Sequence, residues 1–133
     1  GEVCTNGTRV FVHKDCYDIF MERLLIRTRD NVIVGDPLNP ATNLGALISE
    51  NHMQLVLGYI ESGKNEGATL AFGGERIKPN GCENGYFVGP TIFTNCTDDM
   101  RIIREEIFGP VMAVMTFETE EEVIQRANDT IYG

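Results

Sequence analysis

The hydrophobic residues of this chain recur with two periodicities, that of a helix and that of a strand. The helical periodicity of about 3.6 residues is the clearer one. It recurs in three stretches, each preceded by a residue that can cap a helix N-terminus. The predicted N-caps are Asp15, Ser49 and Thr119. Glu122 completes a capping-box pattern with Thr119. The pattern therefore predicts helices over 15–30, 49–66 and 119–128.

Short runs of β-branched and aromatic residues lie between these helices and predict strands. Pairs of turn residues, such as Gly-Pro and Gly-Gly, bound the runs. Because strands alternate with helices, we expect one α/β domain with a mostly parallel sheet flanked by helices. The expected strands are 8–12, 69–72, 86–88, 91–93 and 111–117, the last of which is apolar enough for a central strand.

The charge and composition of the chain exclude several classes of function. Lys and Arg number 11 and Asp and Glu number 20, which gives a formal net charge of −9. This sign argues against binding nucleic acid or an anionic membrane surface, since both attract basic surfaces. The sequence has no long apolar run and no signal peptide, so we expect a cytoplasmic protein with reduced thiols.

The cysteines and histidines do not form a pattern that binds a metal. No C-x-x-C pair occurs among the four cysteines, and the two histidines are far apart in the sequence. We therefore expect no metal site, and we expect both histidines to face the solvent. The residues concerned are Cys4, Cys16, Cys82, Cys96, His13 and His52.

Cys4 is the candidate nucleophile of the chain. It lies among Gly, Thr and Asn just before the first expected strand, and an Asn6-Gly7 turn exposes backbone N–H groups near its sulfur. Such donors stabilise the oxyanion that forms when a thiolate attacks a carbonyl. From composition alone, Cys4 is instead a small buried residue, as free cysteines usually are. The other three cysteines are expected to have a structural or neutral role.

A second segment, residues 104–111, combines two carboxylates, an aromatic ring and a Gly-Pro turn. An ionised carboxylate accepts hydrogen bonds from two neighbouring ribose hydroxyls, and a phenyl ring packs against a flat heteroaromatic ring. Taken without further context, Glu105 and Glu106 are solvated surface charges and Phe108 is a core residue.

Segments 1–9 and 104–111 together resemble the active-site pieces of NAD(P)-dependent aldehyde dehydrogenases. The similarity covers nearly the whole chain. Residues 3–9 and 95–100 look most like the betaine aldehyde dehydrogenase group within that family. The resemblance implies that residues 1–133 are a partial catalytic (thiol) domain and that the dinucleotide-binding domain is absent.

The resemblance also implies a mechanism with NAD or NADP as cofactor. Cys4 attacks a small aldehyde, hydride passes to the nicotinamide, and water releases the acid from a thioester. Glu106 binds the nicotinamide-side ribose, and Phe108 packs near the nicotinamide ring. The family's oxyanion asparagine and glutamate base lie before Gly1, so the isolated chain is expected to be inactive. Glu2 replaces the family's usual glutamine and brings a like charge near the thiolate, which disfavours ionisation.

Two other functions stay open at this point. In the first, the chain is a non-catalytic truncated α/β module that self-associates through exposed apolar surface. Alternatively, it is a thiol hydrolase that acts through Cys4 alone, although no histidine can be paired with this cysteine by spacing. Under the leading hypothesis we also expect a homo-oligomer.

Overall fold

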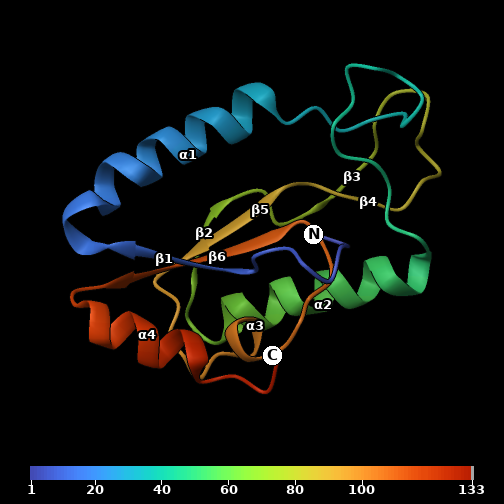
Figure 1. The fold of residues 1–133 in the computed structure, drawn as a ribbon. Coiled ribbons are helices and arrows are strands. Elements are labelled where there is room, and N and C mark those ends of the chain that lie inside the picture. The colour runs from blue at the N-terminus through green and yellow to red at the C-terminus, as the bar shows by residue number, and fades with distance from the viewer. Residues whose placement is uncertain (133) are drawn as a thin grey trace.

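The computed structural model describes residues 1–132, which fold around a four-stranded sheet with helices on both faces (Figure 1). The strand order is β1-β6-β5-β2. β1 and β5 run parallel to β6, whereas β2 runs antiparallel to β5. This confirms the predicted α/β fold with a mostly parallel sheet. The strands are β1 Arg9–His13, β2 Thr69–Phe72, β5 Thr91–Thr94 and β6 Val111–Phe117.

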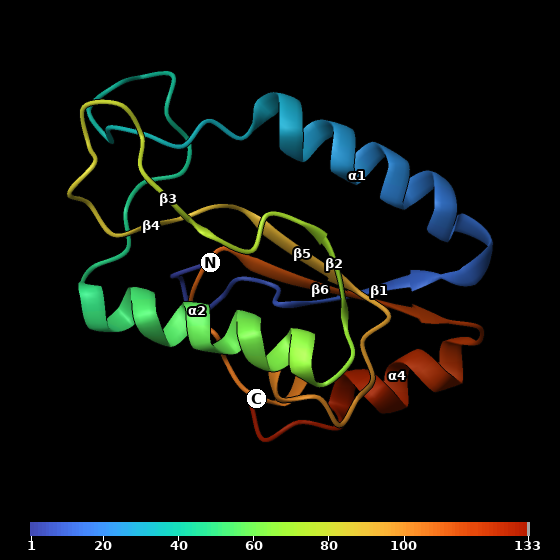
Figure 2. The same cartoon turned by 180° about the vertical axis from the view of Figure 1, so that it is seen from behind.

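One helix covers one face of the sheet and three helices cover the other, as two opposite views show (Figures 1 and 2). Met21 of the single helix packs with Val12 and Val114 from the sheet. On the opposite face, Met53 and Phe93 belong to the larger core and are fully buried. The single helix is α1 Tyr17–Asn31, and the other three are α2 Glu50–Asn65, α3 Arg101–Arg104 and α4 Glu120–Asn128.

Two of the three predicted helix caps are confirmed, and one is wrong. The side chains of Ser49 and Thr119 each accept the backbone N–H three residues later, at 3.2 Å in both cases. Asp15 does not cap α1, because it lies inside a short 3₁₀ helix, η1 Lys14–Cys16. The ring of His13 accepts the Asp15 N–H and so begins this extra turn before the α-helix.

Two short elements have no counterpart among the predicted ones. β3 Arg76–Ile77 pairs with β4 Phe87–Val88 in a separate two-stranded sheet, where only turns were expected before residue 86. α3 has a single turn. β3 lies in a polar stretch that is followed by turn residues, and a single helical turn is too short to show the periodic pattern of a helix. Within residues 1–132, none of the helices is long and apolar enough to cross a membrane.

Candidate active site

Cys4 lies in an exposed turn just before β1, so the alternative that composition alone suggested, a small buried residue, does not hold. The Asn6 N–H donates to the Val3 carbonyl at 2.9 Å and closes this turn. That N–H is therefore committed within the chain and does not face a substrate. The sulfur itself is accessible, as a nucleophile must be.

The turn brings Cys4 to a hollow of about 210 Å³ that Glu106 also lines. These two residues come from segments about a hundred residues apart in the sequence. Phe108, the third residue implied by the resemblance, is half-buried and is not among the lining residues. The structure thus brings Cys4 and Glu106 to one hollow and places Phe108 against His52 instead. The hollow is completed by Asn6, Thr8, Arg9, Ile103, Glu105, Ala127, Thr130 and Tyr132.

Glu105 anchors the segment that carries Glu106, although it was expected to be only a solvated charge. Its carboxylate accepts the Tyr59 hydroxyl at 2.7 Å and pairs with the Arg101 guanidinium at 3.0 Å. The hydrogen bond from Tyr59 and then the hydrogen bond from Arg101 hold the pKa of Glu105 below its ordinary value. In addition, the Glu106 N–H donates to the Tyr132 hydroxyl at 3.2 Å.

Phe108 has a left-handed backbone, with φ of 56°. This conformation is uncommon for a residue other than glycine and stores strain, so neighbouring contacts must hold it. His52 of α2 supplies them: its Nε2 lies 2.6 Å from the Phe108 carbonyl oxygen, and the two rings meet edge to face at 6.0 Å. The side chain of His52 is only 15% exposed. The expectation that it faces the solvent is therefore wrong.

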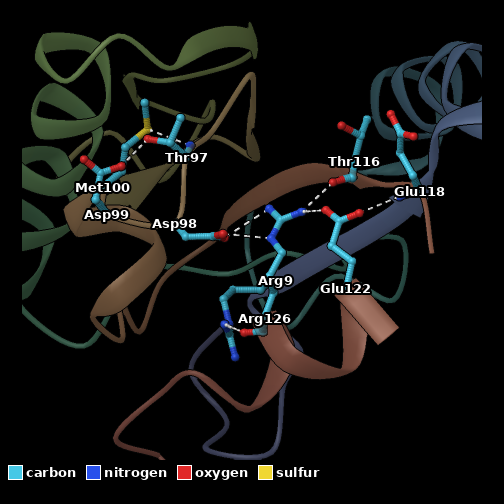
Figure 3. A network of polar contacts seen from close by, with 9 residues as sticks. All are labelled: Arg9, Thr97, Asp98, Asp99, Met100, Thr116, Glu118, Glu122 and Arg126. Atoms are coloured by element: carbon cyan, nitrogen blue, oxygen red, sulfur yellow. Dashed lines mark hydrogen bonds and ion pairs between the residues drawn. The ribbon is translucent and has the colours of Figure 1, made fainter. Parts of the chain in front are cut away.

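A network around Arg126 fixes the end of α4 that borders the hollow (Figure 3). The guanidinium donates to both carboxylate oxygens of Asp98, at 2.8 and 3.0 Å, and to Glu122 at 2.8 Å. These partners, Asp98 first, raise the pKa of Arg126. Arg9 then donates to the carbonyls of Arg126 and Ala127, at 3.1 and 2.9 Å. The network ties β1, which follows Cys4, to the C-terminal turn of α4.

The other three cysteines lie away from this hollow. Cys16 is exposed in η1 and Cys82 is half-buried in a loop. Cys96 is buried, and burial raises the pKa of its thiol to about 11. Among residues 1–132, no group of three His, Cys, Asp or Glu side chains is placed to hold a metal ion.

The hollow presents a thiol and a carboxylate on one surface. Glu106 presents an exposed carboxylate beside the thiol, which suits a ribose diol. Phe108 offers a half-buried ring on the same segment. The fold and the hollow therefore define an α/β domain that presents an accessible thiol next to a carboxylate.

The sequence model of the aldehyde dehydrogenase family matches residues 1–133, and the chain belongs to this family. It is 59% identical, over all of its 133 residues, to the betaine aldehyde dehydrogenase of Brucella anthropi. The chain covers only 27% of that relative, so it spans about a quarter of the length of such proteins.

Solved structures of the family have the same fold as this chain. An aldehyde dehydrogenase from Bacillus cereus in complex with NAD⁺ is 47% identical, with a TM-score of 0.93 over 100% of this chain and 26% of its own. A betaine aldehyde dehydrogenase from Staphylococcus aureus in complex with NAD⁺ is 42% identical, with a TM-score of 0.94 over 99% of this chain and 26% of its own.

Proposed function

We propose that this chain is the thiol-bearing part of the catalytic domain of an NAD(P)-dependent betaine aldehyde dehydrogenase. The observation that carries the proposal is the single hollow shared by Cys4 and Glu106. The 59% identity to a betaine aldehyde dehydrogenase supports the substrate class. Sequence beyond these 133 residues supplies the dinucleotide-binding domain in this proposal. The whole protein is then a cytoplasmic homo-oligomer.

Cys4 acts as the nucleophile in this reaction. Its thiolate forms a bond to the aldehyde carbon, and the carbonyl electrons move to oxygen to give a thiohemiacetal. Departure of a hydride from that carbon leaves a thioester on Cys4, and water releases the carboxylic acid and the free thiol. NAD⁺ or NADP⁺, when bound, is the hydride acceptor.

Glu106 and Phe108 orient the cofactor in this proposal. The Glu106 carboxylate accepts hydrogen bonds from the ribose next to the nicotinamide, and its backbone is steadied by Tyr132. Phe108 limits the movement of the nicotinamide ring. Orientation of the reacting groups contributes much of an enzyme's rate, so fixing these two side chains matters as much as their chemical type.

The cation of betaine aldehyde is bound mainly by other parts of the protein. A quaternary ammonium group is held by aromatic faces, of which tryptophan is the best. The chain has no Trp, and Tyr132 is the one aromatic residue among the described residues that line the hollow. The preference for betaine aldehyde therefore needs aromatic residues outside this chain.

A chimeric enzyme tests the proposal. The segment of the Brucella anthropi betaine aldehyde dehydrogenase that aligns with this chain is replaced by the chain itself. We expect NADH formation with a higher kcat/KM for betaine aldehyde than for uncharged aldehydes of similar size. A folded chimera without activity would count against the proposal, while equal kcat/KM values would reject only the betaine assignment.

A non-catalytic, self-associating module is the second candidate. Ile19 and Ile26 on α1 are 51% and 43% exposed beside an apolar groove of about 750 Å³. Sedimentation of the chain distinguishes this candidate, since Ile19→Lys should then dissociate the oligomer. A thiol hydrolase is disfavoured because no histidine is among the residues that line the hollow of Cys4 within the described chain.

A further inference from the structure

His52 contacts both of the segments that form the candidate active site. Its Nε2 atom lies 2.6 Å from the carbonyl oxygen of Phe108 and 3.6 Å from Oε1 of Glu2. Phe108 belongs to the proposed cofactor segment, and Glu2 is two residues before the proposed nucleophile, Cys4. One half-buried side chain of α2 thus touches two segments that are remote in sequence.

The short contact determines which ring nitrogen of His52 carries hydrogen. A carbonyl oxygen can only accept a hydrogen bond, so Nε2 must be the donor at 2.6 Å. A neutral imidazole donates from only one nitrogen, and the Nε2–H tautomer is then the required one. The Glu2 carboxylate, near the same nitrogen, attracts this hydrogen electrostatically.

The carbonyl that His52 binds belongs to the residue with the strained backbone. Phe108 has a φ of 56°, and a backbone in this region persists only where its surroundings hold it. The hydrogen bond to the carbonyl and the edge-to-face ring contact at 6.0 Å both come from His52. Loss of the imidazole therefore allows the backbone of Phe108 to return to an ordinary conformation.

We propose that His52 is a positioning residue that holds Phe108 in its left-handed conformation and couples it, through Glu2, to the segment that carries Cys4. The coupling itself is a property of this chain. Only its benefit for the reaction, a fixed Phe108 beside the nicotinamide and a fixed segment under the thiol, rests on the proposed function.

Nuclear magnetic resonance on the complete 133-residue chain tests this proposal without cofactor or turnover. Three variants are compared with the parent chain. His52→Leu removes the donor but keeps the bulk, His52→Gln keeps an N–H donor near the place of Nε2, and Glu2→Gln removes the neighbouring charge. The readouts are the ¹⁵N shifts of the His52 ring and the ¹³C shifts of Phe108. Signals of Met21, on the opposite face of the sheet, report whether each variant is folded.

We expect His52 to carry hydrogen on Nε2 in the parent chain. His52→Leu should shift the carbonyl and Cα signals of Phe108, and His52→Gln should restore most of that shift. Loss of one hydrogen bond changes a conformational equilibrium by about threefold to tenfold, which moves an averaged chemical shift measurably. Glu2→Gln should alter the Phe108 signals when His52 is present and leave them unchanged in the His52→Leu background.

Three results would overturn the proposal. The first is an Nδ1–H tautomer in the parent chain, and the second is a Phe108 spectrum that His52→Leu does not change. The third is an effect of Glu2→Gln on Phe108 that is the same with and without His52. If His52→Leu does not fold, two measurements still test the proposal. They are the tautomer of His52 in the parent chain and the Phe108 signals of the Glu2→Gln variant, since both chains keep the imidazole. An inactive chimera would reject the proposed function and would not affect these signals.

Discussion

The contact between Gly109 and Val56 gives the sharpest prediction about how the candidate site is supported. A Cβ atom added to Gly109 would lie 2.7 and 2.9 Å from the two γ-carbons of Val56, which is fully buried on α2. Such distances are shorter than side chains tolerate, so Gly109→Ala must push α2 away from the segment that carries Phe108. Overpacking of this kind costs about 1 to 3 kcal/mol.

The expected size of the effect follows from opposing contributions. The alanine also lowers the conformational entropy of the unfolded chain, which stabilises the folded state by about 0.4 to 1 kcal/mol. Gly109→Ala should therefore lower the free energy of unfolding by about 1 to 2 kcal/mol. Val56→Ala removes two buried methyl groups and leaves a cavity, which should lower it by about 2 to 3 kcal/mol. In the double variant the new methyl group enters the vacated space. The decrease in the free energy of unfolding of the double variant should therefore be at least about 1 kcal/mol smaller than the sum of the decreases in the two single variants.

Urea unfolding of the four chains, followed by circular dichroism, measures this difference. Met21→Ala serves as the matched control, because Met21 packs on the opposite face of the sheet and its effect should add to that of Gly109→Ala. Additivity of Gly109→Ala and Val56→Ala within about 0.5 kcal/mol would refute the close contact between α2 and the segment that carries Phe108.

Three further predictions concern the thiols and the isolated chain. Cys4 should be alkylated before Cys96 under native conditions, because Cys96 is buried and burial raises the pKa of its thiol to about 11. Mass-mapped labelling checks this, and faster labelling of Cys96 would contradict it. Since the unfolded chain loses the Cys96 proton at lower pH than the folded chain, the free energy of unfolding should fall as pH rises from about 9 to about 11, and Cys96→Ala should reduce that fall; urea titrations at several pH values measure it. The isolated chain should form no NADH from betaine aldehyde above a Cys4→Ala control, and clear turnover in a spectrophotometric assay would show that the chain needs no other domain.

The helices α1, α2 and α4 and the strand β6 were predictable from the sequence because each is long enough to repeat its pattern. β6 is apolar except at Thr116 and does lie between β1 and β5. Ser49 and Thr119 cap helices because each side chain accepts the backbone N–H three residues later. Asp15 failed as a cap because the ring of His13, two residues earlier, accepts its N–H and starts a 3₁₀ turn.

The candidate site was predictable only in part. Cys4 and Glu106 belong to recognisable motifs, and the structure places both in one hollow. His52 and Tyr59, which contact Phe108 and Glu105, were given no role at the site by the sequence analysis. Their contacts with Phe108 and Glu105 depend on how α2 docks against a segment 46 to 56 residues away. No local pattern encodes that docking, so only the folded structure reveals it.

The central claim, that Cys4 forms the covalent bond to the aldehyde carbon, is tested most directly by trapping that bond. The chimeric enzyme is mixed with NAD⁺ and betaine aldehyde, quenched in acid during the first turnover, and digested for mass spectrometry. We expect an acyl group on the peptide that contains Cys4, and no NADH from the Cys4→Ala chimera. NADH formation with an unmodified Cys4, or an active Cys4→Ala chimera, would contradict it.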